Sequence, residues 1–193
     1  MKELESAILE QGFGIGSEIV KVDMFLNHRL DVALLTKMGQ AFHDAFAGEK
    51  VDMVLTIEAS GIAAAITTAQ AFGNIPVIFA KKGKTKNQSD DVYMSRVYSF
   101  THGVENYIRI AKSYLPTGSR VLIIDDFLAN GEAAEGLCDI ARQAGAHVVG
   151  IGICIEKGFQ PGGKRLREKG YKVVSLATVE GIDNGKLSLK HEG

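Results

Sequence analysis

Two adjacent carboxylates, Asp125 and Asp126, follow an apolar run at residues 121–124 and precede a turn of small residues. In an open parallel sheet, ligands bind just beyond the carboxyl ends of the strands, where such a pair of side chains would lie. Carboxylates in that place accept hydrogen bonds from sugar hydroxyls or bind a cation such as Mg²⁺. The pattern therefore indicates a site for a polyol or a metal at the end of a buried strand.

The turn after the paired aspartates leads into a predicted helix and is a candidate phosphate site. Free backbone N–H groups and the helix dipole both favour an anion at a helix N-terminus. A strand that ends in solvated acids, followed by an ordinary turn, is the alternative interpretation. The whole run of apolar strand, paired aspartates and small turn is rarer, and it favours a phosphorylated sugar. The residues of the turn are Ala129, Asn130, Gly131, Glu132 and Ala133.

A second junction between a strand and a helix carries Glu58, Ala59, Ser60 and Gly61. Its small residues leave N–H groups accessible, and Ser60 is placed to cap the helix. An ordinary capped junction explains these residues equally well when they are taken alone. Beside the first motif, a second anion site becomes the favoured interpretation.

A run of lysines follows a third strand and opens a long polar segment. Such a run is usually a solvated surface. At the end of a sheet strand, however, cations can also stabilise an anionic leaving group. Lys81 and Lys82 are the candidates for this role, and Lys84 and Lys86 complete the run.

The elements that must position these residues alternate along the chain. Apolar runs at residues 53–57, 77–80, 121–124 and 148–155 predict buried strands of a parallel sheet. Apolar residues at helical spacing predict helices over about residues 31–48, 60–73 and 131–145, with Asp31 as a cap. The expected fold class is α/β, with a central, mostly parallel sheet flanked by helices.

Two parts of the chain depart from this alternation within the single domain expected for residues 1–193. A flexible loop is expected over about residues 82–100, and it leads into a strand-like ribbon that returns over residues 106–110. The chain ends, about residues 1–30 and 158–193, are expected to form a small hood.

The composition limits the possible partners. The chain has 22 basic and 23 acidic residues and a formal net charge of -1, which gives no basis for nucleic-acid binding. No apolar run approaches the ~18 residues that a membrane span needs. The N-terminus lacks the pattern of a signal peptide, so a cytoplasmic protein is expected. Cys138 and Cys154, within apolar segments, are predicted to be small buried hydrophobic residues.

The segment VLIIDDFLANGEA resembles the phosphoribosyl pyrophosphate motif of type I phosphoribosyltransferases. The resemblance implies that Asp125 and Asp126 hold the ribose hydroxyls and that residues 129–133 wrap the 5′-phosphate. It also implies that residues 58–61 bind pyrophosphate and that Lys81 and Lys82 neutralise it. Mg²⁺ is the implied cofactor, bound mainly through the donor.

This chain departs from the family motif at three positions. Many relatives have Thr where Asn130 and Ala133 stand, so two hydroxyl contacts are lost, although backbone amides and the Asn130 amide can donate instead. Hypoxanthine-guanine enzymes have Asp where this chain has Ala129, which argues against that subgroup.

Further segments, KVDMFLNHRLD, VYSFT and GIGICIEKGFQPG, resemble the xanthine-using bacterial members of this family. The resemblance implies that Val20, Asn27 and Lys157 bind the purine, with Val20 standing where Leu is usual. Phe127 and Phe159 are candidates for stacking on the base, although aromatic residues close to strands are more often core. A homodimer is the family expectation.

The implied activity is transfer of a phosphoribosyl group from phosphoribosyl pyrophosphate to an oxopurine, with xanthine expected. A hypoxanthine or guanine enzyme is the near alternative, and a pyrimidine enzyme is disfavoured by the segments around Asn27 and Lys157. A non-catalytic regulator that senses phosphoribosyl pyrophosphate is the alternative from a different class. The lack of a separate DNA-binding segment and of a basic excess disfavours it.

Overall fold

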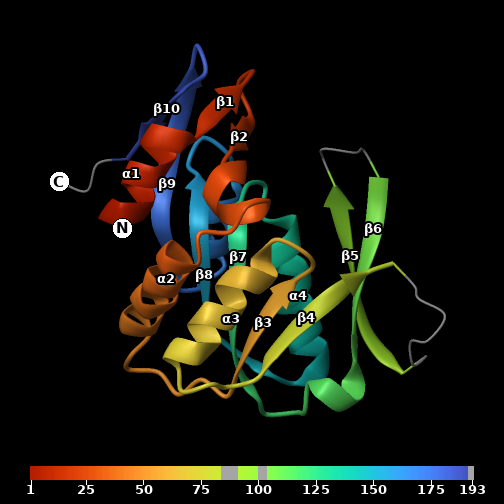
Figure 1. Ribbon diagram of the computed structural model, residues 1–193. Helices are drawn as coiled ribbons and strands as arrows, with labels where there is room; N and C mark the ends of the chain where they lie inside the picture. The colour runs from red at the N-terminus through yellow and green to blue at the C-terminus, as the bar shows by residue number, and fades with distance from the viewer. Residues whose placement is uncertain (84–90, 100–103, 191–193) are drawn as a thin grey trace.

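The computed structural model of the protein describes residues 1–83, 91–99 and 104–190. Among these residues, eight strands form one sheet in the order β10-β9-β8-β7-β3-β4-β6-β5 (Figure 1). The parallel strands are β3 (Met53–Ile57), β4 (Val77–Lys82), β7 (Arg120–Leu128), β8 (His147–Lys157) and β9 (Val173–Asp183). The antiparallel edge strands are β5 (Val92–Ser99), β6 (Val104–Ala111) and β10 (Lys186–Leu189).

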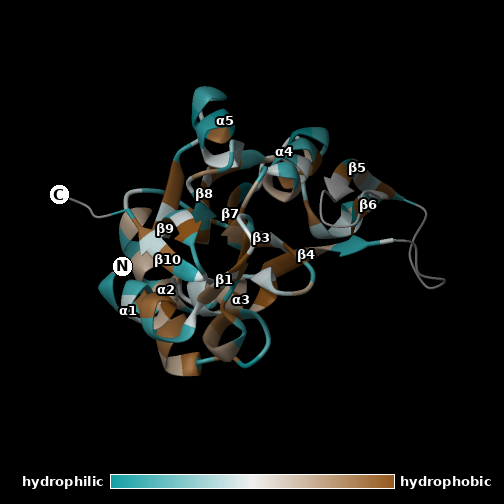
Figure 2. Cartoon of the chain, turned by 90° about the horizontal axis from the view of Figure 1, so that it is seen from above, coloured by the Kyte–Doolittle hydropathy of each residue, from teal (hydrophilic) through white to brown (hydrophobic). Residues whose placement is uncertain are grey.

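Helices cover both faces of the sheet, which is why its central strands carry continuous apolar runs and are buried along most of their length rather than alternating (Figure 2). One face carries α1 (Lys2–Gln11), α2 (Val32–Ala45) and α3 (Gly61–Ala71). The other face carries α4 (Glu132–Ala144) and α5 (Gly162–Glu168).

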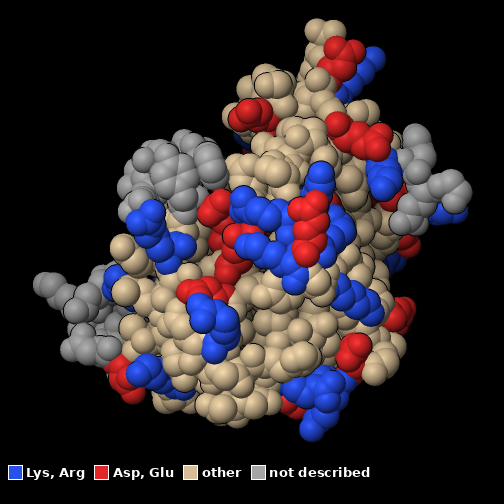
Figure 3. Space-filling view, turned by 180° about the vertical axis from the view of Figure 1, so that it is seen from behind, with Lys and Arg blue, Asp and Glu red and all other residues tan. Residues whose placement is uncertain are grey.

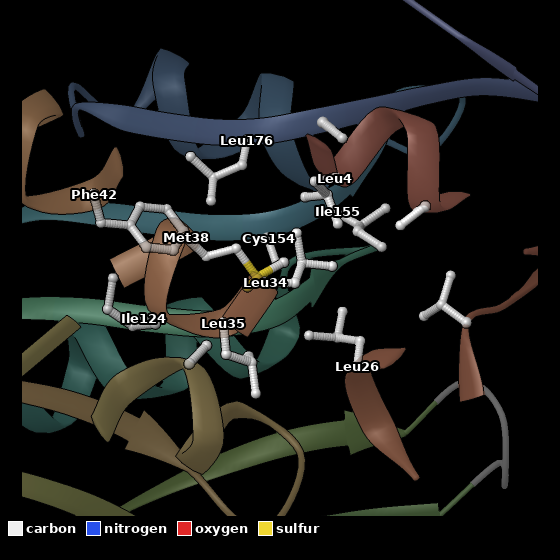
Figure 4. Close-up of a cluster of buried hydrophobic side chains, with 14 of the residues drawn as sticks. Leu4, Leu26, Leu34, Leu35, Met38, Phe42, Ile124, Cys154, Ile155 and Leu176 are labelled. Atoms are coloured by element: carbon white, nitrogen blue, oxygen red, sulfur yellow. The ribbon is translucent and has the colours of Figure 1, made fainter. Parts of the chain in front are cut away.

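The helices are fixed by apolar faces and by local caps. On the first face, Met38 and Phe42 of α2 pack with Ile124 and Cys154 of the sheet, and all four are fully buried (Figure 4). The predicted cap of α2 is confirmed, since Oδ1 of Asp31 accepts a hydrogen bond from the backbone of Leu34 at 3.0 Å. The helix ends at Ala45, however, before the predicted stop near residue 48.

The first and last described elements lie side by side, since α1 and β1 (Phe13–Ile15) both contact β10 (Figure 1). Strands β1 and β2 (Ile19–Lys21) form a separate hairpin, followed by the π-helix Asp23–Asn27. The backbone N–H of Gly14 donates to the carbonyl of Gly185 at 2.9 Å, which joins β1 to the turn between β9 and β10. A short 3₁₀ turn, Lys112–Tyr114, completes the described elements before β7.

The predicted fold class is confirmed, and β3 has the predicted bounds. The assignment of residues 158–193 to the hood is wrong in part, because β9 pairs in parallel with β8 and belongs to the central sheet. The predicted ribbon is present as strands β5 and β6. Because β6 pairs with β4, the ribbon extends the central sheet. Because β5 occupies the second half of the expected loop at residues 82–100, that loop is shorter than predicted, and residues 84–90 lie outside the described structure.

Two other expectations concern the cysteines and the membrane. Cys138 and Cys154 are buried free thiols, as predicted. In the described part of the chain, no helix is both long and apolar enough to cross a membrane.

Candidate active site

A cavity of about 450 Å³ opens at the carboxyl ends of β3 and β7, where the sequence placed its strongest candidates. Three segments line it: the junction between β3 and α3, the end of β7 with the following turn, and the β5–β6 ribbon. The lining residues are Ile57, Glu58, Ser60, Lys82, Val97, Asn106, Ile108, Asp125, Asp126, Phe127, Leu128, Ala129, Asn130, Gly131, Glu132, Ala133 and Ala134.

The paired aspartates form the floor of this cavity. Asp125 and Asp126 are only 5% and 6% exposed, and the backbone N–H of Asp126 donates to Oδ1 of Asp125 at 3.0 Å. Burial and the neighbouring charge of Asp126 raise the pKa of Asp125 well above its usual range, while Lys82 acts in the opposite direction. A ligand that brings hydroxyl donors or a cation would stabilise the two carboxylates in this place.

The glycine that begins α3 allows this helix to approach the aspartates. A β-carbon at Gly61 would lie 2.4 Å from Oγ1 of Thr56, so no other residue fits without displacement. Thr56 is fully buried, and within the described structure its hydroxyl has no hydrogen-bond partner. Close packing thus holds the segment at residues 58–61 against Asp125 at the end of β7.

The turn after β7 leaves the N-terminus of α4 open to the cavity. Gly131 has φ of +87°, a left-handed conformation that glycine adopts without strain, and it turns the chain sharply into the helix. In the described structure no side chain caps α4. Its first N–H groups and its dipole are therefore available to an anion.

The segment at residues 58–61 lies on the opposite wall. Glu58, Ser60 and Lys82 line the cavity, whereas Ala59, Gly61 and Lys81 are absent from its described lining. The Glu58 carboxylate accepts a hydrogen bond from the backbone N–H of Lys82, and the Glu58–Ala59 peptide bond is cis. The predicted capping role of Ser60 is wrong, because its side chain makes no capping hydrogen bond.

The three residues expected to bind the purine do not line the described cavity. Val20 is buried in β2, and Asn27 is exposed at the end of the π-helix. Nζ of Lys157, at the end of β8, donates to the backbone carbonyl of Glu18 at 2.7 Å. It also lies 5.8 Å from the ring centre of Phe127, which does line the cavity. Lys157 thus adjoins the cavity and links it to the β1–β2 hairpin.

The sequence interpretation missed the wall formed by the ribbon. Val97 of β5 and Asn106 and Ile108 of β6 line the cavity together with the turn at residues 129–131 and the start of α4. Val97 and Ile108 also pack on α4, since a β-carbon at Gly136 would lie 2.7 Å and 3.0 Å from their side chains. The strand-like composition of the ribbon was visible, but nothing in the sequence indicates which of its residues reach the site.

A larger groove of about 910 Å³ lies between α5 and the ends of β8 and β9 and contains none of the predicted residues. Its buried acid, Glu156, binds Arg167 through both carboxylate oxygens at 2.8 Å and 2.7 Å. Burial raises the pKa of Glu156, but the hydrogen bonds from Arg167 and Ser175 lower it overall. Because its central charges neutralise each other, this groove is a weaker candidate for a phosphorylated ligand than the smaller cavity.

The described residues contain no group of three or more His, Cys, Asp or Glu side chains that could enclose a metal ion. Asp125 and Asp126 can supply carboxylate oxygens, but only from one side. These residues fit a Mg²⁺ ion that takes most of its ligands from a bound substrate and water.

An α/β sheet that presents paired aspartates and an open helix N-terminus to one cavity is the architecture of a phosphoribosyltransferase. Residues 21–185 match the family described as "Phosphoribosyl transferase domain", and the chain belongs to this family.

The chain is similar over almost its whole length to two curated bacterial proteins named "Xanthine phosphoribosyltransferase". It is 54% identical to the protein of Ruminiclostridium cellulolyticum, with 97% of this chain and 98% of that protein covered. It is 52% identical to the protein of Clostridioides difficile, with 98% and 100% covered.

Solved structures share the fold at lower identity. The adenine phosphoribosyltransferase of Saccharomyces cerevisiae aligns with a TM-score of 0.71 at 20% identity, covering 91% of this chain and 99% of that one. The adenine phosphoribosyltransferase of Rhodothermus marinus aligns with a TM-score of 0.71 at 24% identity, covering 92% and 99%. These two likenesses establish the fold.

Proposed function

We propose that this protein transfers the 5-phosphoribosyl group of phosphoribosyl pyrophosphate to xanthine, giving xanthosine 5′-monophosphate and pyrophosphate. The similarity to proteins of that name across nearly the full chain supports the choice of base. The observation that carries the proposal is that one cavity is lined by the paired aspartates, the open α4 N-terminus and the junction at residues 58–61.

We assign phosphoribosyl pyrophosphate to this cavity because each of its groups finds a complementary group in the cavity lining. The carboxylates of Asp125 and Asp126 accept hydrogen bonds from the two ribose hydroxyls, which compensates their burial. The 5′-phosphate lies on the N–H groups of residues 129–133 at the start of α4. The pyrophosphate lies against residues 58–61, with Lys82 and Lys81 supplying positive charge.

The reaction is a substitution at the anomeric carbon of the donor. The bond from this carbon to pyrophosphate breaks as a purine nitrogen forms the new bond; pyrophosphate leaves with the bonding electron pair, and the proton of the nitrogen passes to solvent water. The chain contributes by holding the donor and by stabilising the charge of the departing pyrophosphate through Lys82. When Mg²⁺ is bound, it supplies further neutralisation of the pyrophosphate oxygens.

The base is assigned to the side of the cavity where Phe127 and Lys157 meet. An ammonium group has three donors, and Lys157 uses one of them on the carbonyl of Glu18, so two remain for ring carbonyls of xanthine. Phe127 offers its ring to the purine. Asn27 and Val20 remain expected contacts of the base in this proposal, on the resemblance to the family of the segment at residues 21–31, which Val20 directly precedes.

We also infer a homodimer in the cytoplasm. Ile66 of α3 and Phe79 of β4 are large apolar side chains that are 47% and 38% exposed, and a subunit interface would cover them. The buried free thiols of Cys138 and Cys154 are compatible with a reducing compartment. Light scattering of the purified protein tests the dimer directly.

The test of the function is pyrophosphate release, measured with Mg²⁺, phosphoribosyl pyrophosphate and one of five bases: xanthine, hypoxanthine, guanine, adenine or uracil. The expected result is the highest kcat/KM for xanthine. A preference for hypoxanthine or guanine would keep the donor site and refute the assigned base. No turnover with any base, together with binding of the donor, would favour the regulatory alternative.

A further inference from the structure

Helix α5 backs the turn that is assigned to the 5′-phosphate. The backbone N–H of Gly162 donates to the carbonyl of Ala129 at 3.0 Å. A β-carbon at Gly162 would lie 2.4 Å from the Ala129 oxygen and 2.6 Å from the Gly131 nitrogen. The turn therefore rests on the backbone of α5, which does not line the described cavity, and no space is left between them for a side chain.

One side chain of α5, Arg165, adds three polar contacts to this backing. Its Nη2 donates to the carbonyl of Asn130 at 2.7 Å and lies 3.1 Å from Oε1 of Glu132. Its Nε donates to Oε1 of Glu135 at 2.7 Å. The planar guanidinium, with donors fixed in a fork, holds a turn carbonyl and two helix carboxylates at once, which lysine cannot do.

The two carboxylates explain why a cation is needed here. Glu132 and Glu135 lie in the first turn of α4, where they favour the helix but would repel a phosphate bound at the same N-terminus. Glu132 itself lines the cavity. Partial burial raises the pKa of Glu135, but the hydrogen bonds of Lys169 and Arg165 lower it overall, so this carboxylate is ionised. Without Arg165, Glu135 would keep its ion pair with Lys169, but Glu132 would lose the ionic partner that it has in the described structure and would face the phosphate uncompensated.

We propose that Arg165 is a positioning residue for the phosphoribosyl donor, which it serves by fixing the phosphate turn and by neutralising Glu132. The inference rests on the proposed function for the identity of the donor. Acidic and basic side chains are interleaved on the rear face of the molecule (Figure 3), and Arg165 forms ion pairs with both Glu132 and Glu135. A surface ion pair that served only stability would not change the affinity for the donor.

The matched pair of variants is Arg165→Met and Lys164→Met, which remove the same charge from adjacent positions of α5. Lys164 is 82% exposed and has a single ionic partner in the described structure, Glu168 at 3.8 Å. We expect Arg165→Met to raise the Kd for phosphoribosyl pyrophosphate by about tenfold to a hundredfold. This is the loss of affinity typical of one hydrogen bond to a charged group. Lys164→Met should bind as the wild type does. Titration calorimetry with the donor and Mg²⁺ gives both values.

Two more variants separate the causes. Arg165→Lys keeps the charge and should give an intermediate Kd, and it carries the test if Arg165→Met does not fold. In Arg165→Met/Glu132→Gln, removal of the uncompensated carboxylate should restore part of the lost affinity. The KM for the purine should change much less than the KM for the donor in every Arg165 variant.

Equal donor affinity in Arg165→Met and Lys164→Met would overturn the inference. Because donor binding is measured without a purine, a wild-type protein that binds the donor but turns over no base would refute the proposed function alone. A wild-type protein that does not bind the donor would refute both.

Discussion

Gly61 lies so close to Asp125 that a β-carbon at position 61 would stand 2.7 Å from Oδ1 of the aspartate. The contact joins the first turn of α3 to the end of β7. In the proposed function, it sets the pyrophosphate-binding segment against the residue that holds the ribose. The distance between the two halves of the donor site is therefore controlled by the absence of one methyl group.

Gly61→Ala is expected to displace Asp125 or the start of α3. A shift of about 1 Å in a reacting group costs about a hundredfold in rate, and we expect a loss of that order in kcat/KM for the donor. The control is Gly48→Ala, because a β-carbon at Gly48 meets nothing within 4 Å and φ there is not positive. Steady-state kinetics of both variants test this prediction, and thermal unfolding confirms that both variants are folded. Equal kcat/KM values would show that the contact does not matter.

Asp126→Asn is expected to lower kcat/KM by about tenfold to a hundredfold, since a charged acceptor for a ribose hydroxyl becomes neutral. The free energy of unfolding should not fall, because the change also relieves repulsion between two buried carboxylates. Kinetics and urea unfolding of the same preparation test both parts. An unchanged rate would remove the ribose role assigned to Asp126.

The pH profile of Lys82→Met tests the electrostatics of the aspartates. Burial and Asp126 raise the pKa of Asp125, and Lys82 partly opposes them, so loss of the lysine should raise this pKa further. The ionised carboxylate is the form that accepts the ribose hydroxyl. The acidic limb of kcat/KM should therefore move to higher pH in the variant, in addition to any loss in rate. If the acidic limb of the kcat/KM profile does not move, Lys82 does not influence the titration of Asp125.

Lys157→Met is expected to raise the KM for xanthine more than the KM for the donor. The chain offers a matched control in Lys172→Met, because Lys172 makes the same two kinds of contact away from the cavity. Its Nζ donates to the carbonyl of Ala45 at 2.8 Å and lies 4.6 Å from the ring centre of Phe46. A xanthine KM that changes equally in both variants would contradict the base-binding role of Lys157.

The pair of Glu156 and Arg167 predicts how stability depends on pH. The pKa of Glu156 in the folded protein lies below its ordinary value of 4.5, so its ionised form stabilises the fold above that pH. The contribution disappears as the pH falls through the lowered pKa. Glu156→Gln should cost about 1–2 kcal/mol near neutral pH, reduced from a fully buried pair because Arg167 is partly exposed, and little in acid.

Urea unfolding at neutral pH and well below pH 4.5 measures this difference. The control is Glu168→Gln, since Glu168 is 64% exposed and pairs with Lys164 at 3.8 Å. A cost for Glu156→Gln that is the same at both pH values would show that packing rather than charge is lost.

The donor side of the site could be predicted from sequence because its signals are local. Asp125, Asp126 and the turn at residues 129–133 are consecutive, and a buried strand before them fixes where they lie. The contacts with more distant segments could not be predicted. Arg165 reaches Asn130 across 35 residues, and Lys157 reaches Glu18 across 139, and no spacing rule connects such positions.

The errors in the fold have the same origin. Strand β9 has Ser175 and Thr178 within its apolar run, so its sequence does not mark it as a buried strand, and its pairing with β8 reveals it as part of the central sheet. Ser60 has the residue type of a cap, but its side chain forms no capping bond where α3 begins against β7. The sequence around Asn106 gives no sign of a functional role. Asn106 reaches the cavity because the β5–β6 ribbon forms part of the cavity wall.

The bond between Gly14 and Gly185 has a consequence for how this protein can diverge. The hairpin near the proposed base site packs on the last two strands of the chain, and Lys157 links it by a hydrogen bond to the side of the donor cavity. A mutation that changes the shape of the hairpin can therefore be compensated by a second mutation in β9 or β10. The residues that bind the donor need not change. Because Phe127 and Lys157 of the proposed base site lie on β7 and β8, a change of preferred purine would involve the hairpin together with the ends of these two central strands.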